Sequence, residues 1–170
     1  MQKRLLSLLA GFAAIPAALA CTCPPGTDFW WQQSSSVVLV RIDSVTSGYE
    51  QAMSRKPCVS SERMCVQKQI ARFTLVEAFK GSGHGLTSLA SGYGGGDCGI
   101  PVVAGAFYVV FLQRGESQIG ICNAAGPYVM RYTDTGTYPK RIEPFLNSLR
   151  KAAKDPKAVI APRPKPQPLE

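Results

Sequence analysis

Six cysteines are the residues of this chain whose type and spacing could do chemistry. They stand at positions 21, 23, 58, 65, 98 and 122. No two of them form the C-x-x-C pair typical of redox sites, and their spacing does not match a zinc knuckle. If a chain of this size is exported, an even number of cysteines favours disulfides, although their number alone leaves many pairings open. We therefore expect structural bridges.

The rest of the sequence offers little for catalysis. His84 is the single histidine, and no serine elbow or second histidine is present to complete a triad or to hold a metal. The glycine-rich run 92–96 lacks the Lys-Ser/Thr of a phosphate-binding loop, so a flexible hairpin is the simpler interpretation. We expect a protein that is not an enzyme and that has no cofactor of its own.

Residues 1–20 have the three parts of a secretion signal. A basic start is followed by the apolar run 5–15 and by the small-x-small cleavage site Ala18-Leu19-Ala20. The run is too short for a membrane-spanning helix and is followed by Pro16. We expect cleavage after Ala20 and a secreted or periplasmic protein without a transmembrane segment. A lipoprotein signal, with an acyl group on Cys21, is the minority alternative.

Cleavage would leave Cys21-Thr22-Cys23-Pro24-Pro25 as the mature N-terminus. Two cysteines at i and i+2 of an extended segment point to the same face, so each can reach a partner on a neighbouring strand. The two prolines fix φ and remove backbone donors, which stiffens the segment further. The sequence therefore predicts a chain end that is rigid rather than frayed.

The net charge of +8 is unevenly distributed. From residue 139 onward, eight basic residues stand against three acidic ones, which gives +5; residues 21–138 carry nine basic and eight acidic residues, which gives +1. A near-neutral domain in an exported protein makes nucleic acid a poor partner. The basic tail could bind an anionic envelope polymer or lipid headgroups, although a solvated tail that aids solubility is the simpler interpretation.

Hydrophobic patterning predicts an all-β domain over residues 21–138. The expected elements are a helical turn at 29–33 and strands at 36–45, 66–80, 86–90, 106–113 and 118–122. The polar segment 46–63 is predicted to be a long hairpin loop, closed by a local disulfide between Cys58 and Cys65. Five strands with glycine-marked turns favour a five-stranded Greek-key barrel of the OB-like type.

The C-terminal residues predict one accessory helix and a tail. Residues 139–154 place apolar side chains at helical spacing, which is typical of an amphipathic helix docked on the barrel. The apolar positions are Ile142, Phe145, Leu146, Leu149 and Ala153. Residues 155–170 alternate prolines with basic residues and predict an extended, disordered tail without a packed core.

Several of these features occur together in one known family. They are Cys21-Thr22-Cys23 at a freed N-terminus, Phe79-Lys80-Gly81, Cys98-Gly99, the strand Tyr108-Val109-Val110-Phe111 and the closing Cys122. Over about residues 21–125 the chain resembles the netrin-like domain, and specifically the N-terminal inhibitory domain of the tissue inhibitors of metalloproteinases. The resemblance implies pairing of Cys21 with Cys98 and of Cys23 with Cys122. A Cys58–Cys65 bridge would be a departure from the family.

The resemblance also implies a function, the inhibition of zinc metalloendopeptidases. In the family, the amine and carbonyl of the terminal cysteine chelate the protease's zinc, and the next side chain enters the specificity pocket. These roles would fall on Cys21 and Thr22, with Cys23, Pro24, Gly96, Asp97 and Cys98 completing the inhibitory edge. The zinc would belong to the target protease. The alternative is a non-inhibitory netrin-like binding module of the cell envelope or extracellular space.

Overall fold

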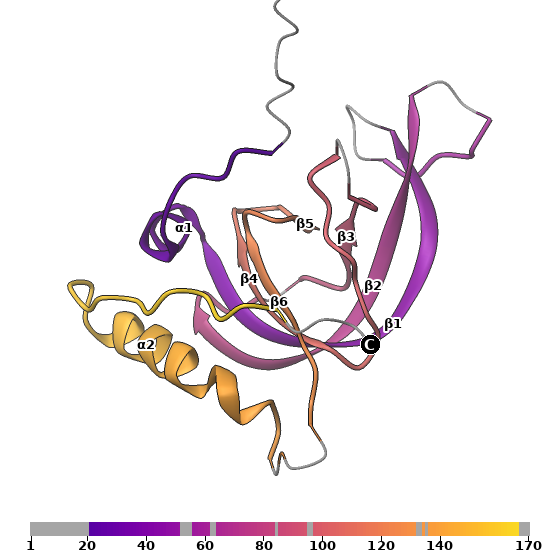
Figure 1. The fold of residues 1–170 in the computed structure, drawn as a ribbon. Helices are drawn as coiled ribbons and strands as arrows, with labels where there is room; N and C mark the ends of the chain where they lie inside the picture. The colour runs from indigo at the N-terminus through magenta and orange to yellow at the C-terminus, as the bar shows by residue number, and fades with distance from the viewer. Residues whose placement is uncertain are drawn as a thin grey trace, which may run out of the picture.

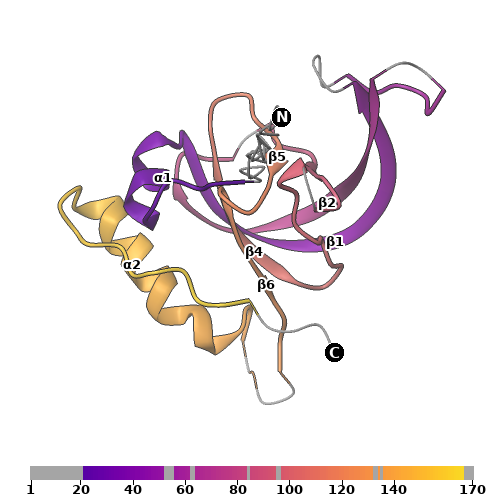
Figure 2. The same ribbon diagram turned by 45° about the horizontal axis from the view of Figure 1, so that its top comes forward.

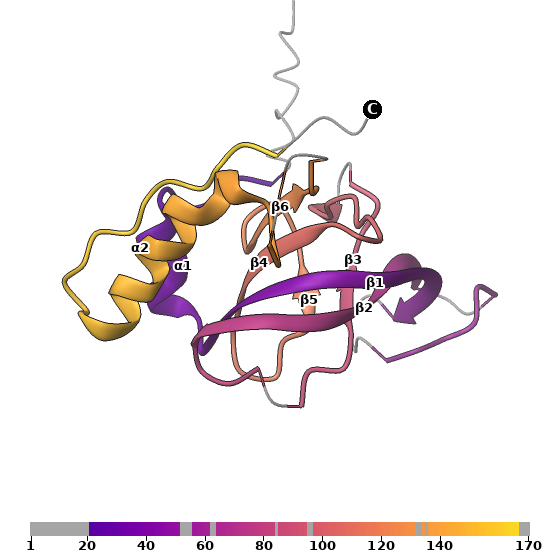
Figure 3. The ribbon, with the colours of Figure 1, turned by 90° about the horizontal axis from the view of Figure 1, so that it is seen from below.

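The computed structural model describes residues 21–51, 56–61, 64–83, 85–94, 97–131, 134 and 136–166. In this part of the chain, six strands form one sheet, and helices α1 (Thr27–Gln33) and α2 (Glu143–Lys154) lie together on one side of it (Figures 1 and 3). The predicted signal segment 1–20 and His84 lie outside the described residues. The expected mainly β fold with an accessory C-terminal helix is confirmed.

A long, bent hairpin of strands β1 (Ser36–Gln51) and β2 (Cys65–Lys80) forms the centre of the sheet. β1 begins with four apolar residues, 37–40, that have no exposed surface. Because neighbouring strand residues point to opposite faces, both faces of the sheet must be covered here. The odd-numbered pair packs in a core shared with the helices, and the even-numbered pair packs in a second core on the other face.

The tip of this hairpin projects away from the helices (Figures 1 and 2). Pairing continues outward to Gln51 opposite Cys65, although the sequence predicted an irregular loop from residue 46. The ladder uses backbone groups, so polar side chains do not end it when both of their faces are open to water. The expected bridge between Cys58 and Cys65 is present near the tip, with Cα atoms 6.3 Å apart.

The sheet order is β5-β3-β2-β1-β4-β6. Its outer strands are β3 (Leu89–Ser91), β4 (Phe107–Leu112), β5 (Gln118–Ile119) and β6 (Ala124–Tyr128). The β3–β5 pair is parallel and the other pairs are antiparallel. The edge strands β5 and β6 are separated in sequence only by residues 120–123. The sheet therefore curls until a single turn joins its two edges.

The last part of the sheet differs from the prediction. The sequence predicted one strand ending at Cys122, whereas the structure has β5, a turn that contains Cys122, and then β6. β6 was not predicted because it contains Pro127. Proline donates no hydrogen bond to a neighbouring strand and is usually excluded from strands. The described sheet is thus a curled, mixed half-barrel of six strands rather than the five expected.

A short 3-10 turn (Lys140–Ile142) leads into α2, and together they match the helical segment predicted over residues 139–154. The buried residues of α2 are Phe145, Leu146, Leu149 and Ala152. They join the core that contains Val37 and Leu39 of β1. Ala152, rather than the predicted Ala153, completes the apolar stripe, because the helix faces the sheet one residue earlier than the spacing suggested.

Arg150 holds α2 against β2. Its Nε and Nη2 atoms donate to the two carboxylate oxygens of Glu77 at 2.7 and 2.6 Å, and Nη2 also donates to the hydroxyl of Tyr138 at 3.0 Å. The hydrogen bonds to Glu77 are the main cause that raises the pKa of Arg150. A bidentate pair fixes direction as well as distance, so it sets the position of the helix along the strand.

The segment after α2 is packed on the protein, in contrast to the predicted disordered tail. Ile160 is only 6% exposed and belongs to the core shared with the helices. The Ala161 N–H donates to the Ser148 hydroxyl at 2.9 Å, and the Tyr128 hydroxyl donates to the Pro164 carbonyl at 3.0 Å. The segment runs along α2 and returns over β6 (Figure 2). The proline-rich composition predicted a solvated tail, but one buried apolar side chain and a few hydrogen bonds are enough to dock the segment on the protein. Residues 167–170 lie outside the described residues.

Ile160→Ala should lower the free energy of unfolding by about 2–3 kcal/mol, because it removes a buried side chain from a packed core. The neighbouring Val159 is 82% exposed, so Val159→Ala is a matched control with an expected change within about 0.5 kcal/mol. Urea unfolding of the two variants measures the difference. Equal midpoints for both variants would mean that the segment is not docked in solution.

Candidate functional site

Two disulfides hold the predicted mature N-terminus against the curled sheet. Cys21 is bonded to Cys98 and Cys23 to Cys122, with Cα atoms 5.5 and 5.2 Å apart. With the bridge at the hairpin tip, these are the three expected pairs; the two at the N-terminus were implied by the family resemblance, and the third by the sequence pattern. Thr22 is exposed between the two half-buried cysteines. We call Cys21–Pro24 together with Asp97, Cys98 and Cys122 the N-terminal edge.

The two anchor points of the N-terminal edge are themselves bonded to each other. The Ile121 N–H donates to the Cys98 carbonyl at 3.0 Å, directly before Cys122 in the chain. A Cβ atom on Gly120 would collide with the same carbonyl oxygen, so the two segments approach closely. The disulfides therefore attach residues 21 and 23 to one rigid base rather than to two independent loops.

One cysteine of the N-terminal edge has a left-handed backbone conformation. The φ angle of Cys98, which is bonded to Cys21, is 57°. This region is uncommon for residues with a Cβ atom and is unfavourable by about 1–2 kcal/mol per residue. Such conformations persist only where the surroundings fix them, and they cluster at functional sites.

The loop before Cys98 is organised by the carboxylate of Asp97. It accepts hydrogen bonds from the backbone N–H groups of Tyr93 at 3.1 Å, Gly94 at 3.0 Å and Gly99 at 3.0 Å. Gly92 lies so close behind that a Cβ atom there would collide with the carboxylate. The described part of this loop is thus a defined turn rather than the flexible hairpin that its glycines suggested. Gly96, predicted as part of the inhibitory edge, lies outside the described residues.

Two buried polar side chains, which the sequence did not single out, hold this loop from below. Gln69 donates from Nε2 to the carbonyls of Gly92 at 2.7 Å and Ile100 at 3.2 Å, and its Oε1 accepts from the Val102 N–H at 3.1 Å. The Ser91 hydroxyl both donates to and accepts from Ile100 at 2.9 Å. Gln69 lies two residues before Ala71 on the same strand, so both side chains are on the apolar face. A polar residue at such a position could have identified Gln69 from the sequence.

The Asp97 carboxylate is held in its charged form. Burial acts to raise its pKa, but the backbone N–H groups and the Lys68 ammonium, 4.0 Å away, outweigh burial and keep the pKa below its ordinary value. A carboxylate with a lowered pKa stabilises the fold above its unfolded pKa of about 3.9, and that contribution is lost as the pH falls through the lower folded value. The turn before Cys98 should therefore loosen only in strong acid.

Asp97→Asn should speed amide hydrogen exchange at Gly94 and Gly99 at neutral pH, because an amide oxygen replaces a charged acceptor and an NH₂ group now faces backbone donors. In the native protein the same amides should lose protection only below about pH 4. Asp43→Asn, which changes an exposed aspartate on β1, is the control and should leave them unchanged. Protection factors from NMR test this; native-like protection in Asp97→Asn would show that the carboxylate does not organise the turn.

Exposed apolar side chains surround the N-terminal edge. Tyr93 is 51% exposed and Ile121 is 43% exposed, and the Tyr93 hydroxyl lies 2.7 Å from the Ser47 hydroxyl of β1. With the exposed Pro24, these side chains come from three separate segments that the disulfides bring together. Apolar groups around a chain end that is held at two points suit contact with a protein surface.

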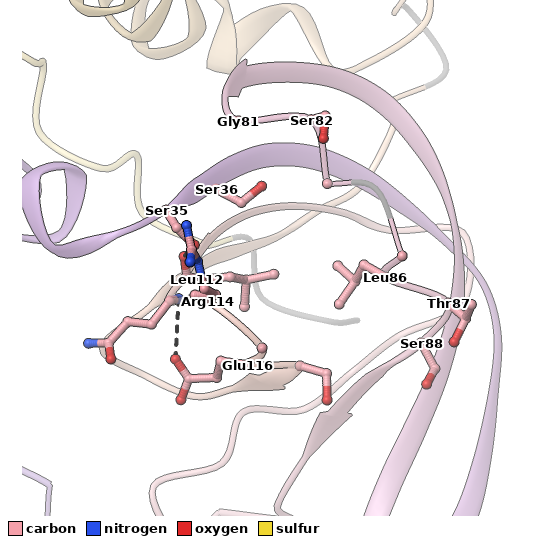
Figure 4. Close-up of a pocket in the computed structure, with 15 residues that line it drawn as sticks. Ser35, Ser36, Gly81, Ser82, Leu86, Thr87, Ser88, Leu112, Arg114 and Glu116 are labelled. Atoms are coloured by element: carbon pink, nitrogen blue, oxygen red, sulfur yellow. Dashed lines mark hydrogen bonds between the residues drawn. The ribbon is translucent and has the colours of Figure 1, made fainter.

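A polar pocket of about 540 Å³ lies elsewhere, between the start of β1 and the turns after β2 and β4 (Figure 4). Its lining is rich in hydroxyl groups, which come from Ser35, Ser36, Ser82, Thr87, Ser88 and Ser117. The Gln113 N–H donates to Glu116 at 3.4 Å across its rim. The pocket shares no residue with the N-terminal edge, so the two are separate features of the surface.

Two further observations concern metals and membranes. Among the described residues, no group of three or more His, Cys, Asp or Glu side chains could hold a metal ion. None of the helices in the described part of the chain has the length and apolar character needed to cross a bilayer.

Comparison of the sequence with protein-family models and with curated proteins finds no match.

Proposed function

We propose that the chain is an exported inhibitor of zinc metalloendopeptidases that acts through the amine and carbonyl of Cys21. The observation that carries the proposal is the double attachment of Cys21 and Cys23 to one hydrogen-bonded base. A chain end held at two points has little freedom left to lose when it binds, so more of the contact energy remains as affinity. We further propose that the protein binds its partner and catalyses no reaction.

A finer fold assignment supports the same proposal. We take the curled sheet to be a five-stranded, Greek-key, OB-like barrel of the netrin-like type, resembling the inhibitory domain of the tissue inhibitors of metalloproteinases. In this assignment residues 118–128 are one strand, interrupted at Cys122, that pairs with β3 on one side and with β4 on the other. The N-terminal edge then lies at the point where the barrel closes.

The proposed chemistry is the displacement of a zinc-bound water. A catalytic zinc keeps one position open for water or substrate. The α-amino nitrogen and carbonyl oxygen of Cys21 can form a five-membered chelate at that position, with a zinc that belongs to the protease. Thr22 supplies a small, exposed side chain for the adjoining specificity pocket. Pro24, Asp97 and Cys98 flank the chelate and limit how the partner can approach.

The mechanism requires a free amine on Cys21 and therefore cleavage after Ala20. The intact mass of the mature protein should correspond to a chain that begins at Cys21 and has all six cysteines in disulfides. A lipid on Cys21, as in the minority alternative, would block the amine and exclude chelation. Retained residues before Cys21 would exclude it as well.

The chelate also predicts a dependence on pH. Only a neutral amine binds zinc, and free α-amino groups have a pKa of about 7.7–8.0. Complex formation should therefore release a proton, and inhibition should weaken as the pH falls below that range. The pH dependence of the protease itself must be measured separately. A small active-site inhibitor without an amine, titrated over the same pH range, serves as this control.

The experiment that tests the proposal is a titration of the mature protein against a panel of zinc endopeptidases, with serine and cysteine proteases as controls. We expect stoichiometric inhibition of at least one zinc enzyme and of none of the controls. If no zinc enzyme responds, the protein is the non-inhibitory binding module. Its partner would then be an anionic envelope polymer, bound through the exposed Lys151, Lys154, Lys157 and Lys165 in a salt-sensitive way.

A further inference from the structure

The hydroxyl-lined pocket of Figure 4 has walls that are joined to one another. The N–H and hydroxyl groups of Ser35 both donate to the Leu112 carbonyl, at 2.9 and 3.2 Å, which ties the start of β1 to the end of β4. A Cβ atom on Gly81 would collide with the Ser35 carbonyl oxygen. The turn after β2 therefore lies directly against this wall.

The remaining walls are the segment before β3 and the turn between β4 and β5. The Ala90 N–H donates to the Ser117 carbonyl at 2.9 Å, which holds the two segments together where β3 and β5 begin to pair. The Glu116 N–H closes the turn by donating to the Gln113 carbonyl at 3.1 Å. The cavity of about 540 Å³ thus has a defined shape, and its volume lies within the range of about 300–1,000 Å³ typical of small-molecule sites.

Three hydroxyl groups of this pocket are available to a ligand. Within the described part of the chain, the hydroxyls of Thr87, Ser88 and Ser117 have no hydrogen-bond partner. Thr87 is exposed and the two serines are half-buried, so solvent reaches this part of the lining. The Ser36 hydroxyl also has no partner, but it is buried beneath the surface and is not counted here. A hydroxyl both donates and accepts, so this lining matches a ligand that does the same.

The pocket has balanced charge and an apolar part. Among the described residues that line it, Arg114 and Glu116 are the charged ones, and their charges are opposite. Its apolar part consists of Leu86 and Leu112, which also pack in the second core. A pocket lined by one sign of charge attracts ions of the other sign, whereas this lining favours a neutral ligand.

We propose that this pocket binds a neutral saccharide of one or two rings. The edge of a sugar ring carries hydroxyl groups, which can pair with Thr87, Ser88 and Ser117. The faces of the ring carry C–H groups, which can pack on the two leucines. The site shares no residue with the N-terminal edge and does not depend on the proposed inhibition.

Titration of the native protein with sugars, followed by its amide NMR signals, tests the proposal. The neutral probes are glucose, N-acetylglucosamine and maltose at up to about 20 mM, which nearly saturates a site with a dissociation constant of about 1 mM. At least one of them should shift the amide signals of Gly85, Ser88 and Ser117 in a saturable way. Glucuronate and glucose 6-phosphate, which are anionic, should bind at least about tenfold more weakly.

Two results of this titration would overturn the proposal. One is the absence of saturable shifts at the pocket with all three neutral sugars. The other is binding of an anionic sugar as tight as that of the neutral ones. Both are measured on the native protein, so neither depends on how well a variant folds.

Ser88→Ala and Ser117→Ala then test the hydroxyl groups. Each removes one neutral hydrogen bond and should raise the dissociation constant of the responsive sugar by about two- to tenfold. Ser44→Ala, at an exposed position of β1 outside the pocket, is the matched control and should leave the constant unchanged. Native affinity in both pocket variants would mean that the sugar does not use these hydroxyls and would contradict the proposed site.

Discussion

Replacing Cys23 and Cys122 with serine should lower the free energy of unfolding by about 4–5 kcal/mol. The bridge spans 99 residues, and in the chain-entropy model a loop of this length restricts the unfolded chain strongly. Its loss also releases one of the two attachments of the N-terminal edge. Inhibition should therefore weaken even under conditions in which the variant is folded. Chemical denaturation and a protease titration on the same sample measure the two effects separately.

The bridge at the hairpin tip provides the control for this prediction. Cys58 and Cys65 are separated by only 7 residues, so their replacement with serine should lower the free energy of unfolding by about 2.5 kcal/mol or less. The hairpin tip is not part of the N-terminal edge, so inhibition should be retained. An equal loss of stability in both variants, or a loss of inhibition in the hairpin variant alone, would contradict our description of the edge.

The strands and helix with strong periodicity could be predicted from sequence. The apolar run 37–40 lies in a predicted strand, and α2 followed from apolar residues at helical spacing. The two attachments of the N-terminus followed from a resemblance rather than from spacing. Their geometry depends on contacts between residues that are distant in sequence.

The parts that sequence reasoning missed have a common physical cause. β6 contains Pro127, and the docked C-terminal segment is rich in proline and lysine, so local composition argued against both. Each is held instead by contacts distant in sequence, such as those of Ile160 and Tyr128. Gln69 was overlooked for the same reason, since its acceptors lie in a loop more than twenty residues away.

An alanine placed before Cys21 should abolish inhibition while leaving the fold unchanged. The added residue converts the α-amine of Cys21 into an amide, which is a poor zinc ligand, and moves the new amine out of chelating position. We expect the inhibition constant to rise by at least about a hundredfold, which corresponds to about 2.8 kcal/mol of binding free energy. Carbamylation of the native amine should have the same effect. The denaturation midpoint should not change, because the disulfides are intact.

A chain that carries the same alanine after Glu170 is the matched control. It has the same composition and mass as the extended variant but keeps the amine of Cys21 free. It should inhibit as the native protein does. A loss of inhibition in both extended chains would indicate a general effect of the added residue rather than loss of the chelate.

The ratio of inhibition constants for the two alanine-extended chains, measured against one responsive zinc endopeptidase, tests the central claim most directly. We predict a ratio of at least about one hundred in favour of the chain with a free Cys21 amine. A ratio near one would show that inhibition does not use the N-terminal chelate.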